Sequence, residues 1–271
     1  MSPDPTAPVL DVQEVSVHFG GVRALDSVSL TVRPGQVTGL IGPNGAGKTT
    51  LFNVLSGLQR PDRGRVYLEG REVSSLGPHR RAQLGLARTF QRLELFWSLT
   101  VAENVQVGAE SSVQWWKLRR RTTKSRAVGA PGVPAFGGSG VAALLDRVGL
   151  AGLNDRPVDS LPTGQARLVE LARALSIGPR LLLLDEPGSG LDDSESAALG
   201  DLLVDLAADG MAVLLVEHDM DLLMRVCSHV YVFDYGQLIA AGSPAEVRTN
   251  VAVQSAYLGG SPAASQPGER P

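Results

Sequence analysis

The stretch VTGLIGPNGAGKTT, residues 37–50, decides the fold of this chain. Residues 37–41 are mostly apolar, as in a buried strand, and Gly42 begins a glycine-rich loop that leads into a helix starting near Lys48. The loop matches the pattern G-x-x-x-x-G-K-[ST] in full, and a strand before it and a helix after it are the context that this motif requires. We therefore expect a strand, a glycine-rich loop and a helix in direct succession.

This loop has the chemistry to bind a polyphosphate. Its glycines let the backbone wrap a phosphate chain and direct the amides inward. Lys48 is expected to reach the β- and γ-phosphates, and the Thr49 hydroxyl to hold Mg²⁺. A chance glycine loop is the alternative, and it leaves the flanking strand and helix unexplained. The predicted phosphate-binding residues are Gly42, Pro43, Asn44, Gly45, Ala46, Gly47, Lys48, Thr49 and Thr50.

Two further apolar runs, residues 181–184 and 211–216, predict strands that are buried on both faces, as in a parallel sheet covered by helices. The first run ends in Asp185 and Glu186, and open parallel sheets bind their ligands at that end of a strand. Asp185 suits Mg²⁺, reached through water, and Glu186 is placed to polarise an attacking water as a general base. The alternative is an acidic strand end that begins a turn at Pro187.

Two polar residues are weaker candidates for the same pocket. His218 follows the second strand and could touch a γ-phosphate, although a single histidine after a strand is more often structural. Gln91, in ARTFQ, could contact Mg²⁺ or water and follow the movement of a neighbouring helical region. On its own it would be read as a surface glutamine.

Alternating apolar and polar residues predict a second, antiparallel sheet in residues 10–32 and 65–69, and the run from Val230 predicts two short strands around Tyr235 and Gly236. The fold class is therefore predicted as α/β. It has a P-loop NTPase (RecA-like) core, an N-terminal antiparallel β-subdomain and an inserted α-helical subdomain.

The predicted organisation is a single domain between two loose tails rich in Pro, Ser, Ala and Gly. A helical insert divides the α/β core in sequence. The predicted boundaries are tails at 1–8 and 260–271 around a domain at 9–259, with the core in 9–90 and 162–259, the insert in 91–161 and a flexible stretch in 111–140.

Composition excludes several classes of protein. Hydrophobic residues make up 43% and charged residues 20%, as in globular proteins, and a net charge of −3 argues against nucleic acid as the main partner. The single cysteine, Cys227, allows no intramolecular disulfide and fits a reducing compartment. No apolar run approaches the roughly 18 residues of a membrane span, and the first residues do not form a secretory signal. We expect a cytosolic protein that could attach to a membrane through a partner.

The stretch LPTGQARLVELARAL, from Leu161, predicts a helix with one apolar face and little bulk before its N-terminus. A helix N-terminus carries unpaired amides and a partial positive charge, so it suits an anion. The sequence alone leaves open which anion that is and which molecule holds it.

The motifs in their order closely resemble the ATP-binding subunits of ABC transporters, over about residues 10–259. They are Phe19, the loop at 42–50, Gln91, LPTGQ, LLLLDEP, Asp192 after Leu191, and His218. Within that family the chain is most similar to importer subunits for branched-chain amino acids and for amides such as urea. The C-terminal stretch 216–259 and the turn PGSGLDD, 187–193, carry this closer resemblance.

The resemblance implies that two such subunits face head to tail and bury two ATP molecules between them, with Mg²⁺. The loop usually written LSGGQ then faces the γ-phosphate held by the other subunit. In this chain that signature loop is Leu161, Pro162, Thr163, Gly164 and Gln165. The resemblance also implies that Asp192 contacts the opposing subunit and that Phe19 stacks on adenine. The alternative for Phe19 is a strand residue packed in the core.

This chain departs from the family pattern at two positions of the signature loop. Pro162 replaces serine and Thr163 replaces the first glycine. Proline has neither a hydroxyl nor an amide hydrogen, but it is acceptable at the start of a helix. We expect a weakened but working loop, with an inactive site as the competing interpretation.

The resemblance further implies partners and a location. The partners are a second ABC ATPase subunit, identical or distinct, two transmembrane permease subunits and an extracytoplasmic solute-binding protein, and no nucleic acid. The protein would lie peripherally at the cytoplasmic face of the cell membrane. The segment after Gln91, residues 92–105, would form a groove for a permease helix, although Leu95, Phe96 and Trp97 could be ordinary core. Residues Trp115–Arg121 suit a membrane interface or a solvated excursion.

Three alternative functions remain open from the sequence. The first is a soluble ABC ATPase that acts on the ribosome or on nucleic acid, which the single domain and the lack of a basic bias disfavour. The second is a binding module controlled by nucleotide without hydrolysis, which the intact catalytic residues disfavour. The third is the ATPase subunit of an exporter of lipid-linked material.

Overall fold

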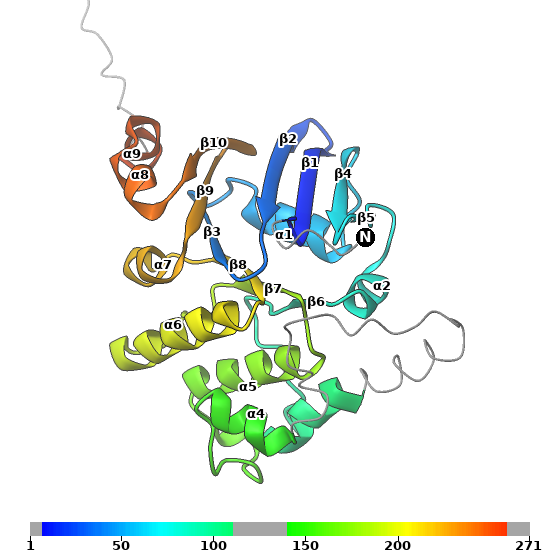
Figure 1. Ribbon diagram of the computed structural model, residues 1–271, viewed down its shortest axis with the longest axis vertical. Helices are drawn as coiled ribbons and strands as arrows, with labels where there is room; N and C mark the ends of the chain where they lie inside the picture. The colour runs from blue at the N-terminus through cyan, green and yellow to red at the C-terminus, as the bar shows by residue number, and fades with distance from the viewer. Residues whose placement is uncertain (1–6, 111–139, 259–271) are drawn as a thin grey trace, which may run out of the picture.

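The structure is a computed structural model that describes residues 7–110 and 140–258. Its strands form two sheets (Figure 1). The antiparallel sheet has the order β2-β1-β4-β5, with strands β1 (Leu10–Phe19), β2 (Val22–Val32), β4 (Arg63–Leu68) and β5 (Arg71–Glu72). The other sheet has the order β10-β9-β3-β8-β7-β6, with strands β3 (Val37–Ile41), β6 (Leu86–Arg88), β7 (Leu181–Asp185), β8 (Ala212–Val216), β9 (His229–Asp234) and β10 (Gln237–Gly242).

The strand predictions are confirmed, including their type. Strands β6, β7, β8, β3 and β9 are parallel, and β10 closes one edge antiparallel to β9. Every residue of β3, β7 and β8 is buried, as the continuous apolar runs predicted. In β2 the buried residues Val28, Leu30 and Val32 alternate with more exposed ones, as in a sheet with one wet face.

Helices cover the parallel sheet, and α1 lies between the two sheets (Figure 1). The bounds are α1 (Lys48–Ser56), α2 (Pro78–Gln83), α4 (Val141–Arg147), the 3₁₀ turn Val158–Ser160, α5 (Thr163–Ser176), α6 (Asp193–Ala208), α7 (Met220–Val226), α8 (Pro244–Thr249) and α9 (Val251–Leu258). Residues 101–110 are also helical. In the described ranges, no helix has the length and apolar character needed to cross a bilayer.

Two apolar cores lie on opposite faces of the parallel sheet, and β7 shows how one strand serves both. Leu181 and Leu183 pack into the core that holds α1 and the antiparallel sheet. Leu182 and Leu184 pack into the core formed with α4, α5, α6 and the helical residues 101–110. The core is therefore continuous between the sheet and the helical part, which packs the helical part against this face of the sheet.

A buried arginine holds the C-terminal end of α1. Arg81 of α2 is fully buried and donates hydrogen bonds to the carbonyls of Val54 (2.6 Å), Leu55 (2.7 Å) and Leu76 (2.9 Å). The last carbonyls of a helix have no partner within the helix, so a cation there satisfies them and the helix dipole. Burial lowers the pKa of Arg81 to about 10, so the guanidinium is still charged at neutral pH.

Replacing Arg81 by Met is expected to lower the free energy of unfolding by about 2–4 kcal/mol, because buried carbonyls lose their donors. Urea unfolding followed by circular dichroism measures the change. Arg80→Met, an exposed change in the same helix, serves as the control and should cost less than about 0.5 kcal/mol. Equal midpoints for the Arg81 and Arg80 variants would contradict this role.

Candidate nucleotide-binding and hydrolysis site

Four adjacent strands bring the predicted site together. Strands β3, β8, β7 and β6 are parallel neighbours, so their carboxyl ends meet at one edge of the sheet. The loop at 42–47 follows β3, Gln91 lies shortly after β6, Glu186 follows β7, and His218 lies shortly after β8. Residues that are far apart in the sequence therefore share one edge.

The loop after β3 has the backbone of a phosphate cradle. Gly47 has a φ of +104° at the N-cap of α1, and a Cβ there would lie 2.6 Å from the carbonyl oxygen of Ala24. A Cβ on Gly42 would lie 2.2 Å from the carbonyl oxygen of Phe233. Only glycine fits at these two positions, so the spacing of the motif follows from steric limits.

Lys48 lies in the first turn of α1 and turns back across the loop. Its Nζ donates to the carbonyl of Gly42 (2.5 Å) and to that of Pro43 (3.0 Å). Burial lowers the pKa of Lys48, while the charges of Glu186 and Asp185 oppose that shift. The amine is therefore held at the mouth of the loop, next to both carboxylates.

Asp185 at the end of β7 has a partner that the sequence did not predict. Arg88 of β6 places its Nη2 3.3 Å from the Asp185 Oδ2 and donates through Nη1 to Asn53 (2.8 Å) and Ser56 (3.0 Å) of α1. Burial raises the pKa of Asp185, and the Arg88 charge opposes this shift. Arg88, the last residue of β6, therefore links the C-terminal end of β7 to helix α1.

The three predicted catalytic residues converge on one carboxylate. Gln91 donates its Nε2 hydrogen to Glu186 Oε2 (3.0 Å), and His218 Nε2 lies 2.6 Å from Glu186 Oε1. Glu186 has a φ of +52°. This backbone conformation is unfavourable for a residue other than glycine, so the surrounding structure must hold it in place. Its side chain is 16% exposed and that of His218 is 53% exposed, so the carboxylate opens toward solvent on the histidine side.

Glu217 is a site residue that the sequence reasoning missed. It is buried, and its carboxylate accepts hydrogen bonds from the amides of Gly188 (2.6 Å) and His218 (3.1 Å). It thereby joins the turn after Glu186 to the loop that carries His218. An acidic residue at the end of an apolar strand was the signal that could have found it. Burial raises the pKa of this carboxyl group, and the amide hydrogen bonds oppose the shift.

The arrangement fits a nucleoside triphosphate with Mg²⁺. The amides of the loop and of the first turn of α1 suit phosphate oxygens. Mg²⁺ prefers oxygen ligands and is commonly held by one or two protein groups together with phosphates and water. The exposed Thr49 hydroxyl and the Asp185 carboxylate offer such oxygens beside Lys48. The contact of Gln91 with Mg²⁺ and the stacking role of Phe19 stay predictions.

The loop at 161–165 lies against the turn that contains Asp192. Helix α5 begins at Thr163, and its N-cap is Pro162, which has no capping side-chain hydrogen bond. A Cβ on Gly164 would meet the side-chain ends of Leu191 and Glu195 at 2.8 Å, so this glycine packs closely against the start of α6. Asp192 caps α6 by accepting from the amide of Glu195 (2.8 Å).

Three surface predictions have different outcomes. Phe19 is 52% exposed, so the alternative of a core residue is wrong for it. Leu95 is buried in the core, whereas Phe96 and Trp97 are 47% and 48% exposed. The predicted patch Trp115–Arg121 lies outside the described residues.

Two family models match the chain. One, described as "ABC transporter", matches residues 25–189, more than half of the chain. The other, described as "Branched-chain amino acid ATP-binding cassette transporter", matches residues 237–263. The second match covers the C-terminal region in which the closer resemblance lay.

Individual relatives are similar to this chain along nearly its whole length. The high-affinity branched-chain amino acid transport ATP-binding protein BraF of Pseudomonas aeruginosa is 38% identical over 259 residues, covering 93% of this chain and 98% of that protein. The lipopolysaccharide export system ATP-binding protein LptB of Acidithiobacillus ferridurans is 36% identical, with 93% and 97% covered. The ADP conformation of an ATP-binding cassette of an ABC transporter matches with a TM-score of 0.79 and 31% identity, over 94% of this chain and 100% of that one. This protein belongs to the ABC transporter family, as an ATP-binding subunit that hydrolyses ATP.

Proposed function

We propose that this protein is the ATP-hydrolysing subunit of an importer for branched-chain amino acids or related small polar solutes. Hydrolysis is supported by the convergence of Gln91 and His218 on Glu186, beside the phosphate-binding loop. The solute class is supported by the C-terminal family match and by BraF. The relative LptB is named as part of an export system. The experiment below must therefore distinguish an importer from an exporter.

Each step of hydrolysis has a residue in this chain. The loop amides and Lys48 hold the β- and γ-phosphates. Thr49 and Asp185 would hold Mg²⁺, which would neutralise phosphate charge. Glu186 takes a proton from the attacking water. The water oxygen forms a bond to the γ-phosphorus as the bond between that phosphorus and the ADP oxygen breaks. His218 and Gln91 fix the carboxylate for that transfer, so positioning supplies most of the rate.

A second ATPase subunit completes this site. The first-turn amides of α5 have no partner within the helix and suit an anion that the partner holds. Thr163 and Gly190 are close enough that a Cβ on Gly190 would lie 3.6 Å from Thr163 Cγ2. The loop at 161–165 and the turn around Asp192 therefore make one continuous surface for the partner. Pro162 weakens this loop and leaves it working, since Gly164 and the amides that follow it are kept.

The remaining partners are two permease subunits and an extracytoplasmic solute-binding protein, and the subunit lies at the cytoplasmic face of the membrane. The exposed Phe96 and Trp97 support a permease contact in the segment after Gln91. A net charge of −3 supports partners other than nucleic acid.

Gentle co-purification of the tagged protein from native membranes tests the function, with every partner identified by mass spectrometry. We expect two multi-span permeases, a second ATPase subunit and a solute-binding protein that binds a branched-chain amino acid. Recovery with components of a lipid-linked export system would replace the importer by the exporter. Recovery with ribosomes or nucleic acid, and without membrane proteins, would overturn the transport function.

A further inference from the structure

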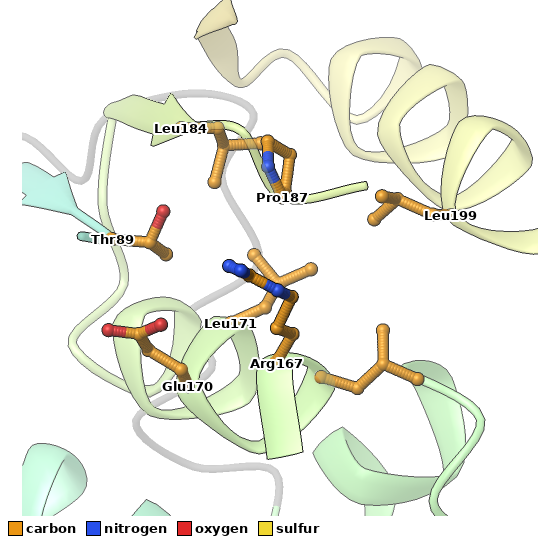
Figure 2. Close-up of a pocket in the computed structure, with 8 residues that line it drawn as sticks. Thr89, Arg167, Glu170, Leu171, Leu184, Pro187 and Leu199 are labelled. Atoms are coloured by element: carbon orange, nitrogen blue, oxygen red, sulfur yellow. The ribbon is translucent and has the colours of Figure 1, made fainter. Parts of the chain in front are cut away.

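A small cavity lies next to the C-terminal end of β7, which Glu186 follows (Figure 2). It is lined by Leu184 and Pro187 on either side of that strand end, by Thr89 after β6, and by Arg167 of α5. The space open to the centre of a water molecule is about 10 Å³, close to the minimum that holds one water. The cavity is therefore the meeting point of the Gln91 segment, the Glu186 strand and α5.

Two polar atoms that line this cavity are buried without a hydrogen-bond partner in the described part of the chain. They are the Thr89 hydroxyl oxygen and the Arg167 Nε. Figure 2 shows the Arg167 side chain reaching up from α5 into the space between Thr89 and Pro187. A buried polar group without a partner is destabilising, so a native protein rarely leaves two in one cavity. A single bridging water would satisfy both atoms.

Helix α5 also contacts the backbone of the Gln91 segment directly. The buried Glu170 Oε1 lies 3.5 Å from the amide nitrogen of Phe90, and Arg167 Nη2 lies 3.5 Å from the carbonyl oxygen of Gln91. Both distances are at the outer limit of a hydrogen bond, so each contact alone is weak. A water that joins the Thr89 hydroxyl to the Arg167 Nε would add a further link between the same two segments, because a bridging water is nearly as favourable as a direct hydrogen bond.

We propose that Arg167 and Glu170 are positioning residues that, with one water molecule bound in this cavity, fix the Gln91 backbone to α5. The Gln91 side chain donates to Glu186, so the junction sets the place of the general base. Helix α5 begins in the loop at 161–165. A shift of that loop against a partner's nucleotide is therefore transmitted to this subunit's own Glu186. This inference rests on the proposed function for its link between two nucleotide sites.

The first test needs no ATPase activity. Hydrogen–deuterium exchange of the full-length protein compares wild type with Glu170→Leu, Glu170→Gln and Arg167→Met. We expect amides in residues 89–95 to exchange about tenfold faster in Glu170→Leu, because the acceptor is lost, and Glu170→Gln to retain most of the protection. Peptides from α1 should be unchanged. Unchanged exchange at 89–95 in Glu170→Leu would overturn the junction.

The second test asks whether Arg167 acts through Gln91. We expect Arg167→Met to lower kcat about tenfold with little change in KM, and to cause no further loss in a Gln91→Ala background. Additive losses in the double variant would overturn the positioning role. Arg60→Met, an exposed change outside the site, is the charge-matched control. If wild type has no ATPase activity, the proposed function fails while the exchange experiment still decides the junction.

A crystal structure tests the bound water separately. A high-resolution crystal structure should show one ordered water within about 3.2 Å of both the Thr89 hydroxyl and the Arg167 Nε. A dry cavity with both atoms still unpaired would remove the water from the proposal.

Discussion

Replacing Glu186 by Gln is expected to lower ATP turnover by about 10²–10⁴-fold while leaving nucleotide binding intact. The amide keeps the size of the side chain and can still accept from Gln91, which lies 3.0 Å away. It cannot take a proton from water. The measurement is phosphate release by the assembled complex, together with binding of a fluorescent ATP analogue.

The positive φ of Glu186 makes this comparison sharp, because glutamine tolerates that backbone no better and no worse than glutamate. A loss of turnover cannot then be assigned to relieved strain. Glu14→Gln, at an exposed residue that also has a positive φ, serves as the control and should keep full activity. Turnover near that of wild type in the Glu186 variant would refute its role as the base.

Local chemistry made the strand-to-loop transitions predictable from the sequence. The motif at 42–50 carries its own context, and its glycines are required by contacts with Ala24 and Phe233. The continuous apolar run of β7 showed that both faces are buried, and alternate leucines indeed face the two cores. Glu186 and His218 became candidates from the rule that ligands bind at the carboxyl ends of parallel strands. Gln91 was a weaker candidate, supported by its place in the order of motifs. Glu186, His218 and Gln91 therefore came together as expected.

The long-range partners of these residues could not be predicted in the same way. Strand β6 is only three residues long, too short to leave a periodic pattern, so the partnership of Arg88 with Asp185 had no visible signal. Arg81 lies in a polar stretch of sequence and is nevertheless fully buried, because the end of α1 offers it carbonyls. Tertiary contacts, rather than local propensity, decide the position of such residues.

Replacing Lys48 by Met should weaken nucleotide binding without unfolding the protein. Lys48 is 8% exposed, and its charged form is disfavoured by burial, so loss of the amine costs the folded state little. Loss of charge-assisted hydrogen bonds to the phosphates should weaken ATP binding by at least about tenfold and by up to about a hundredfold.

Thermal unfolding separates these two effects of the Lys48 change in one experiment. Because a ligand that binds only the folded state raises the Tm, Mg·ATP should stabilise wild type and Glu186→Gln. It should shift the Lys48→Met variant far less at the same concentration. Without nucleotide, the Lys48→Met variant should melt at or above the wild-type Tm. A full ATP-induced shift in this variant would mean that the loop amides alone hold the phosphates. A large loss of Tm without nucleotide would mean that the Lys48 contacts with the carbonyls of Gly42 and Pro43 maintain the fold of the loop.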